Sequence, residues 1–212
     1  TSLYLILISD IVKWTGDLEF ARSLKDSINQ ALNWIDAYGD ADGDGFIEYE
    51  TRSKRGLVNQ GWKDSGNSVV HTDGRLARPP IALSEVQAYA YYAKRRMSEL
   101  FALLDDRDRA AQLADQAALL KQRYNESFWL ENEQFFAMAL DHDKKPVRTV
   151  TSNPAHGLWA RIVEDDKARL MADRMMHPDM FSGWGIRTVR KSSTATSMTG
   201  SSRARSSSQR SR

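Results

Sequence analysis

Hydrophobic residues along this chain recur mostly at helical spacing. Over residues 2–14 they occupy almost every face, a pattern typical of a helix that other helices enclose. Over residues 18–35 they fall on one face opposite polar positions, and Tyr38-Gly39 then marks a helix end. These two patterns predict a helical hairpin at the start of the chain, with the first helix on the inside.

Two long helices are predicted in the middle of the chain. The first opens at Pro80, because proline fits the first turn of a helix, and covers residues 80–104. Asp105 and Asp106 then suit the N-cap of a second helix, whose apolar positions reach Tyr124.

The last third of the chain predicts shorter elements. Apolar residues at 128–130 and 135–140 flank three polar ones, which is typical of a β-hairpin. Two short helices are predicted at 153–162 and 165–175, the second ending before Pro178. With helices in hairpin pairs and long polar loops on one side, we expect an all-α fold of two concentric helical layers whose working loops share one end.

A stretch of about forty residues, 40–79, has no regular pattern, and a loop of this length between helices is typical of a functional segment. Its residues 59–65, Asn-Gln-Gly-Trp-Lys-Asp-Ser, set one carboxylate among amides, an indole and an ammonium. An aromatic face can stack on a pyranose ring, amides can hold its hydroxyls, and an acid can protonate a glycosidic oxygen. We therefore predict a sugar site with Asp64 as the catalytic acid. The ligands predicted from the same segment are Asn59, Gln60, Trp62 and Lys63.

Spacing alone also allows a simpler interpretation of Asp64. An aspartate beside Lys63 is often part of a surface ion pair, or forms a turn with the backbone that follows it. Trp62 and the two amides favour the sugar site, because they are costly choices for a plain turn. A general acid must also hold its proton near neutral pH, and Glu85 or Glu48 could supply the like charge that this requires.

Other candidate sugar ligands lie outside that segment. Glu85 is near the start of the helix predicted at 80–104, although a glutamate there is as often a partner of the helix dipole. His156 could donate a hydrogen bond to a hydroxyl beside Trp159, although a lone histidine is more often structural. Trp184 lies between two glycines, which would expose its face for stacking; the alternative is a core tryptophan with flexible flanks.

One segment matches the first eight positions of a calcium-binding loop, with oxygen ligands at Asp40, Asp42 and Asp44. The match then fails, because position twelve is Thr51 instead of a bidentate glutamate and no second amphipathic helix follows. We favour a series of Asx turns that positions Glu48 and Tyr49, two further candidate sugar ligands. We expect neither a metal nor another cofactor.

Composition narrows the class of protein. The chain has 212 residues and no cysteine, which excludes disulfides and fits the cytoplasmic location that we expect. It has no apolar run long enough to cross a membrane, so we expect no membrane partner. The net charge of +2 comes from the Ser- and Arg-rich segment 191–212, which has no acid and no aromatic residue. We expect disorder there, and no nucleic-acid partner.

Taken together, several stretches resemble the catalytic domain of the amylo-α-1,6-glucosidase family, of bacterial glycogen-debranching type, and its mannosylglycerate-hydrolase-like relatives. The resemblance covers residues 1–190 and rests on residues 18–39, 42–49, 59–65, 73–74, 79–87, 152–159 and 182–187. It implies an (α/α)6 barrel, of which this chain holds about half the helices. It further implies an inverting glycoside hydrolase that acts on an oligo- or polysaccharide, with Asp64 as general acid. The residues that would line the sugar pocket are Tyr49, Gln60, Trp62, Lys63, Glu85 and His156.

The sequence departs from that family in three ways. Asn67 stands where an acid is common. The family's second carboxylate, which an inverting mechanism needs as a base, lies beyond the part that residues 1–190 match, so we expect this chain alone to be inactive. After Arg190, where relatives continue with an aromatic-rich stretch, this sequence turns to Ser and Arg. We interpret this change as the frameshifted end of a gene fragment. Reading the coding DNA in its other two frames tests that interpretation.

Two alternatives stay open at this point. One is a non-catalytic carbohydrate-binding or scaffold module, whose Asp64→Asn variant would behave like its parent. The other is an (α/α)6 hydrolase or phosphorylase of a small disaccharide.

Overall fold

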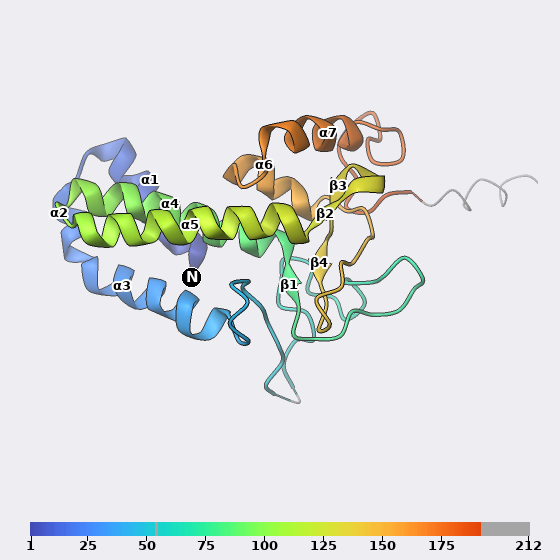
Figure 1. Cartoon of the computed structure of the whole chain (residues 1–212), viewed down its shortest axis with the longest axis horizontal. Coiled ribbons are helices and arrows are strands. Elements are labelled where there is room, and N and C mark those ends of the chain that lie inside the picture. Colours follow the sequence, from blue (N-terminus) through green and yellow to red (C-terminus); the bar gives the residue numbers. More distant parts are fainter. Residues whose placement is uncertain (54, 192–212) are drawn as a thin grey trace, which may run out of the picture.

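The computed structural model describes residues 1–53 and 55–191, and its fold is largely helical, as the sequence predicts (Figure 1). The helices and helical turns are, in chain order, α1 (Ser2–Thr15), α2 (Leu18–Ser23), α3 (Lys25–Trp34), η1 (Ile35–Gly39), α4 (Ser84–Leu103), α5 (Arg107–Ser127), η2 (Glu131–Glu133), η3 (Asn153–Ala155), α6 (His156–Ala160) and α7 (Asp165–Met175). The strands are β1 (Ala82–Leu83), β2 (Trp129–Leu130), β3 (Phe135–Phe136) and β4 (Ala139–Leu140). Of the segment 191–212, for which we predict disorder, all but Lys191 lies outside the described residues. None of the described helices is both long enough and apolar enough to cross a membrane.

Helices α4 and α5 form the central pair of the fold. They lie side by side, and α1 packs on α4 (Figure 1). Asp106 is the N-cap of α5, as predicted, and its carboxylate accepts a hydrogen bond from the backbone N–H of Arg109. The prediction that other helices enclose α1 is wrong for the described part of the chain. Leu5 is fully buried, but Leu7 is 57% and Trp14 90% exposed, because the neighbouring helices cover only one side of α1.

The amphipathic helix predicted at 18–35 is interrupted in the structure. It forms as α2 and α3, which meet at Leu24, and the π-helical turn η1 carries the chain on to Gly39. The hydroxyl of Ser23 donates to the carbonyl of Phe20 at 2.7 Å. A serine that bonds back to its own helix backbone competes with the helical hydrogen bonds and bends the helix, which accounts for a break at this point.

The helix predicted from Pro80 begins four residues later, at Ser84. The residues before it form β1, which pairs antiparallel with β4, and β4 lies more than fifty residues further along the chain. The predicted hairpin at 128–140 therefore contributes to two sheets, because β2 and β3 pair with each other while β4 pairs with β1.

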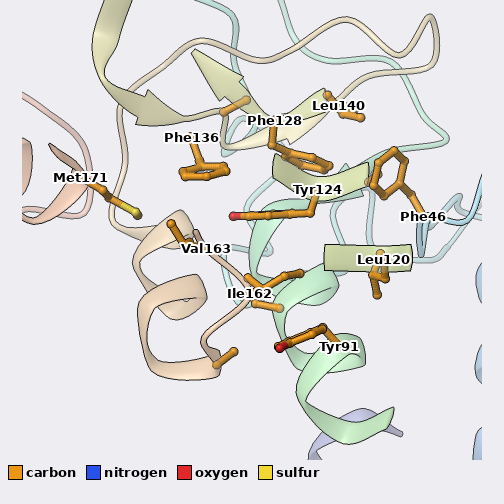
Figure 2. Packing of buried hydrophobic residues seen from close by; sticks show 14 of the residues in the cluster. Phe46, Tyr91, Leu120, Tyr124, Phe128, Phe136, Leu140, Ile162, Val163 and Met171 are labelled. Atoms are coloured by element: carbon orange, nitrogen blue, oxygen red, sulfur yellow. The ribbon is translucent and has the colours of Figure 1, made fainter. Parts of the chain in front are cut away.

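The main hydrophobic core lies where α5 meets the short strands (Figure 2). Tyr124 of α5 is fully buried, and its ring stacks on those of Phe128 and Phe136, each with a centroid distance of 4.9 Å. The Tyr124 hydroxyl and the Ser84 hydroxyl share a hydrogen bond of 2.6 Å. This core therefore fixes the first residue of α4, which directly precedes Glu85.

The loops gather at the end of the central pair where α4 begins and α5 ends (Figure 1). The backbone of Tyr49 pairs with that of Ile81, and the hydroxyl of Thr149 donates to the carbonyl of Val70 at 2.6 Å. This arrangement confirms the prediction that the long polar loops share one end of the helical body.

Candidate functional site

The segment 59–65 is held in place by the side chain of Asn59, which is 3% exposed. Its Oδ1 accepts a hydrogen bond from the hydroxyl of Tyr49 at 2.8 Å, and its Nδ2 donates to the carbonyl of Ser65 at 2.6 Å. Tyr49 is itself fixed, because its backbone pairs with Ile81 beside β1. One buried amide thus joins both ends of the segment to the helical body.

The middle of the segment lies close to the start of α4. A Cβ atom added at Gly61 would lie 2.2 Å from Leu83 Cδ1 and 3.4 Å from Glu85 Oε1, so a larger residue would collide with Leu83 where the segment approaches Glu85. Lys63 Nζ donates to the carbonyl of Thr188 at 2.6 Å, which ties the segment to the last loop of the described chain. Burial lowers the pKa of Lys63, and the charge of Glu85 opposes that effect.

Glu85 is a buried carboxyl group beneath this segment. It lies in the first turn of α4, is 1% exposed, and accepts a hydrogen bond on Oε1 from Asn153 Nδ2 at 2.8 Å. Burial raises the pKa of Glu85, whereas the hydrogen bonds that it accepts and the charge of Lys63 act to lower it. Within the described residues, Glu85 Oε2 and Asn153 Oδ1 are buried without a hydrogen-bond partner. Acceptors of this kind are costly in a fold, and they suit hydrogen bonds from a polar ligand.

One turn further along α4, Tyr89 meets an imidazole and an indole from α6 (His156–Ala160). The hydroxyl of Tyr89 and Nδ1 of His156 are 2.9 Å apart, and Tyr89 and Trp159 pack edge to face with centroids 6.3 Å apart. Burial lowers the pKa of His156, which favours its neutral ring. Burial and the nearby charge of Glu85 raise the pKa of Tyr89. The neutral pair can therefore donate and accept hydrogen bonds near neutral pH.

Four predicted site residues are exposed: Gln60, Trp62, Asp64 and Trp184. Trp62 is 64% and Trp184 99% exposed, which leaves large aromatic faces open to solvent. Trp184 lies on a separate turn, in which Phe181 pairs with Ile186. Across residues 1–53 and 55–191, no hydrogen bond or ion pair occupies the carboxylate of Asp64. The structure thus fixes the two ends of segment 59–65 and leaves its acid free to meet a ligand.

The structure places Glu48 apart from this group. Its side chain is 1% exposed and forms an ion pair with Lys144, which also pairs with Asp42 and Asp44. The predicted Asx turns are present, because Asp42 and Asp44 each accept a hydrogen bond from the backbone N–H two residues later. The carboxylates of the calcium-like loop therefore surround a lysine side chain.

Two residues of the site are missing from the sequence-based prediction. Tyr89 was identifiable in principle, because it follows Glu85 by one helical turn and shares its face. Asn153 starts η3, far from α4 in sequence, and only the fold brings its amide to Glu85. Its signal was indirect, an Asn-Pro pair three residues before the predicted site residue His156.

The groups around Glu85 can together hold a ligand with many hydroxyls. A buried carboxyl and amides accept or donate hydrogen bonds, Lys63 and His156 add donors or acceptors, and open indole faces offer stacking surfaces. The exposed carboxyl of Asp64 adds a group that can transfer a proton.

Comparison with known proteins agrees with this chemistry. Residues 2–195 match the family model described as the mannosylglycerate hydrolase MGH1-like glycoside hydrolase domain. Among solved structures, the chain is similar to a sialidase with a TM-score of 0.61 and 19% identity over 82% of this chain. It is also similar to a GH78 family rhamnosidase of Bacillus sp. GL1 with a TM-score of 0.64 and 13% identity over 84% of this chain. The matched region spans 15% of the sialidase and 17% of the rhamnosidase. No curated protein matches the chain.

Proposed function

The chain belongs to the family of mannosylglycerate hydrolase MGH1-like glycoside hydrolase domains, and on that premise we propose that it forms the acid-bearing part of a catalytic site for α-glycosidic bonds in an oligo- or polysaccharide. The observation that carries the proposal is the tethered segment 59–65, which lies over the buried carboxyl of Glu85 and presents Asp64 without a hydrogen bond or ion pair to any described residue. A specificity like that of amylo-α-1,6-glucosidases, an inverting mechanism and an (α/α)6 barrel belong to the same proposal.

In this proposal Asp64 protonates the departing glycosidic oxygen. A general acid has to hold its proton when the substrate binds, which requires removal of water from around the carboxyl. The described residues leave Asp64 exposed. In this proposal the bound sugar therefore displaces the water around its carboxyl. Trp62 stacks on a sugar ring, and its 64% exposure leaves room for this contact.

The buried groups hold the sugar's hydroxyls. Glu85 Oε2 and Asn153 Oδ1 accept hydrogen bonds from them, and Lys63 and His156 supply complementary contacts. An inverting mechanism also needs a base that activates water at roughly 6.5–9.5 Å from the acid. We assign that role to none of the described residues, and the intact protein is therefore the form to be tested.

An activity assay of the intact protein on a panel of glycosides tests this proposal. The panel contains isomaltose-type, trehalose-type and mannosylglycerate substrates, and proton NMR follows the anomer that is released first. We expect hydrolysis of at least one substrate with inversion at the anomeric carbon. Absence of cleavage across the panel, with sugar binding retained, would instead support the carbohydrate-binding module, and phosphate-dependent cleavage would support a phosphorylase.

Glu85→Gln should stabilise the fold at alkaline pH and weaken the activity. Because burial raises the pKa of Glu85 above its ordinary value of 4.5, the folded protein holds this proton more tightly than the unfolded chain, and stability falls as the pH rises above 4.5. Glutamine does not titrate, so the variant should gain about 1 kcal/mol over its parent at pH 8 and little at pH 4. Because the variant loses the charge-assisted hydrogen bonds between the Glu85 carboxylate and the sugar, its kcat/KM should fall by about tenfold or more.

Urea unfolding of the parent and the Glu85→Gln variant at both pH values checks the stability effect. Glu126→Gln, which alters an exposed glutamate on α5, serves as the matched control and should show no gain that depends on pH. A variant that is less stable than its parent at pH 8 would contradict the account of Glu85.

A further inference from the structure

The ammonium group of Lys144 has an unusual environment outside the proposed sugar site. Its Nζ lies 2.8 Å from Asp42 Oδ2 and 2.6 Å from Asp44 Oδ2, and it also contacts Glu48 Oε1. One cation thus meets three carboxylates, all from the segment 40–48.

The acidic segment is folded as a cage around this position. Both carboxylate oxygens of Asp40 accept backbone N–H groups, from Gly43 and Gly45, each at 2.8 Å. Asp42 and Asp44 each use Oδ1 for a backbone N–H and direct Oδ2 at the ammonium group. Ligand atoms of the three aspartates lie within 4.8 Å of one another.

Glu48 provides a second observation that points to a cation. Its side chain is 1% exposed, and its Oε1 contacts the ammonium group of Lys144. Within the described residues Glu48 Oε2 is buried without a hydrogen-bond partner, while Oε1 faces the shared cation. A single ammonium group therefore leaves part of the coordinating capacity of this cage unused.

The backbone of Lys144 has a conformation that is uncommon for lysine. Lys144 has a φ of 57°, in the left-handed region that glycine and asparagine adopt more readily than lysine. It sits in a tight turn closed by a hydrogen bond of 2.9 Å from its N–H to the carbonyl of Asp141. Contacts of the ammonium group with the carboxylates offset that backbone preference.

We propose that Lys144 is a built-in substitute for a divalent cation, and that the cage of Asp40, Asp42, Asp44 and Glu48 becomes a calcium site when the ammonium group is removed. Calcium prefers six to eight oxygen ligands at about 2.3–2.6 Å, so the carboxylate oxygens that now contact the ammonium group could approach a calcium ion in its place. Four carboxylates, backbone carbonyls and water can supply that number. Lys144 is a positioning residue, because it holds Glu48 in place. Glu48 directly precedes Tyr49, whose hydroxyl donates a hydrogen bond to Asn59 of the proposed sugar site.

The variant Lys144→Gln tests this inference without any activity assay. The intact protein is stripped of metal with a chelator, and its melting temperature is measured with and without millimolar calcium chloride. The parent should show no shift with calcium. The variant should melt about 5 °C or more below the parent, since the buried carboxylate of Glu48 and the partly exposed Asp42 and Asp44 lose their shared cation. Calcium should restore most of that loss, and calorimetric titration should show one site in the variant alone.

Two further variants and a refolding experiment complete the test. Lys145→Gln removes a neighbouring lysine that is 72% exposed, and it should change neither the melting temperature nor calcium binding. The double variant Lys144→Gln/Asp42→Ala, which removes a ligand oxygen, should lose calcium binding. If Lys144→Gln does not fold in chelator, refolding in calcium should recover it. Calcium binding by the parent, or a Lys144→Gln variant that calcium neither stabilises nor refolds, would overturn the inference.

Discussion

Replacing Asp64 with asparagine should lower kcat of the intact protein by about 10²- to 10⁴-fold, the range that a positioned general acid contributes. The change keeps the size of the side chain and removes only the proton that the departing oxygen needs. Stability should hardly change, because Asp64 is exposed and makes no hydrogen bond or ion pair with another described residue. Steady-state kinetics on the substrate identified in the glycoside panel, together with urea unfolding, measure both effects.

A remote aspartate provides the control for this prediction. Asp108 is exposed on α5 and lies far along the helix from the loop end, so Asp108→Asn should leave kcat unchanged. If Asp64→Asn retained the activity of its parent, the acid role would be lost and the binding-module alternative would gain support.

The largest expected loss of stability comes from Phe136→Ala, at about 3–5 kcal/mol. Phe136 is fully buried, stacks on Tyr124 at 4.9 Å and packs edge to face on Trp129 at 5.1 Å. Its removal leaves a cavity between α5 and the strands that these rigid rings cannot close (Figure 2). Chemical denaturation with fluorescence detection measures the effect.

Leu119 offers a control, because it is 47% exposed on α5, the helix that carries Tyr124, and Leu119→Ala should cost less than about 1 kcal/mol. Phe136→Ala should also raise KM, since Tyr124 fixes Ser84 at the residue before Glu85. A loss similar to that of Leu119→Ala would mean that the core does not depend on the aromatic stack.

Local sequence signals predicted the elements that local physics determines. The capped helix α5 appeared where Asp106 and the helical period placed it. The start of α4 was misplaced because β1 takes its hydrogen bonds from β4, a partner that no local pattern at Pro80 reveals. The prediction that other helices enclose α1 was wrong for a related reason. Apolar residues show that a helix surface can be buried, but the neighbouring elements decide which part of that surface is buried.

The same distinction applies to the site. Residues 59–65 could be singled out from their own chemistry, because a tryptophan, a lysine and an acid stand together in a long loop. The pairings of Glu85 with Asn153 and of Glu48 with Lys144 each join residues more than sixty positions apart, and only the tertiary structure shows them. The position of Glu48 beside Tyr49 predicts a sugar ligand, whereas the structure pairs its side chain with Lys144, because successive residues of an extended segment point in opposite directions.

The most direct test of the acid role compares two leaving groups in the Asp64→Asn variant. In a glycosyl fluoride of the same sugar, the fluoride ion leaves without being protonated. In the natural glycoside, the departing oxygen needs a proton from the acid. The account predicts that the variant hydrolyses the fluoride within about tenfold of its parent while it loses at least about 10²-fold on the glycoside. Equal losses on both substrates would contradict it, because Asp64 would then act at some step other than proton transfer to the departing oxygen.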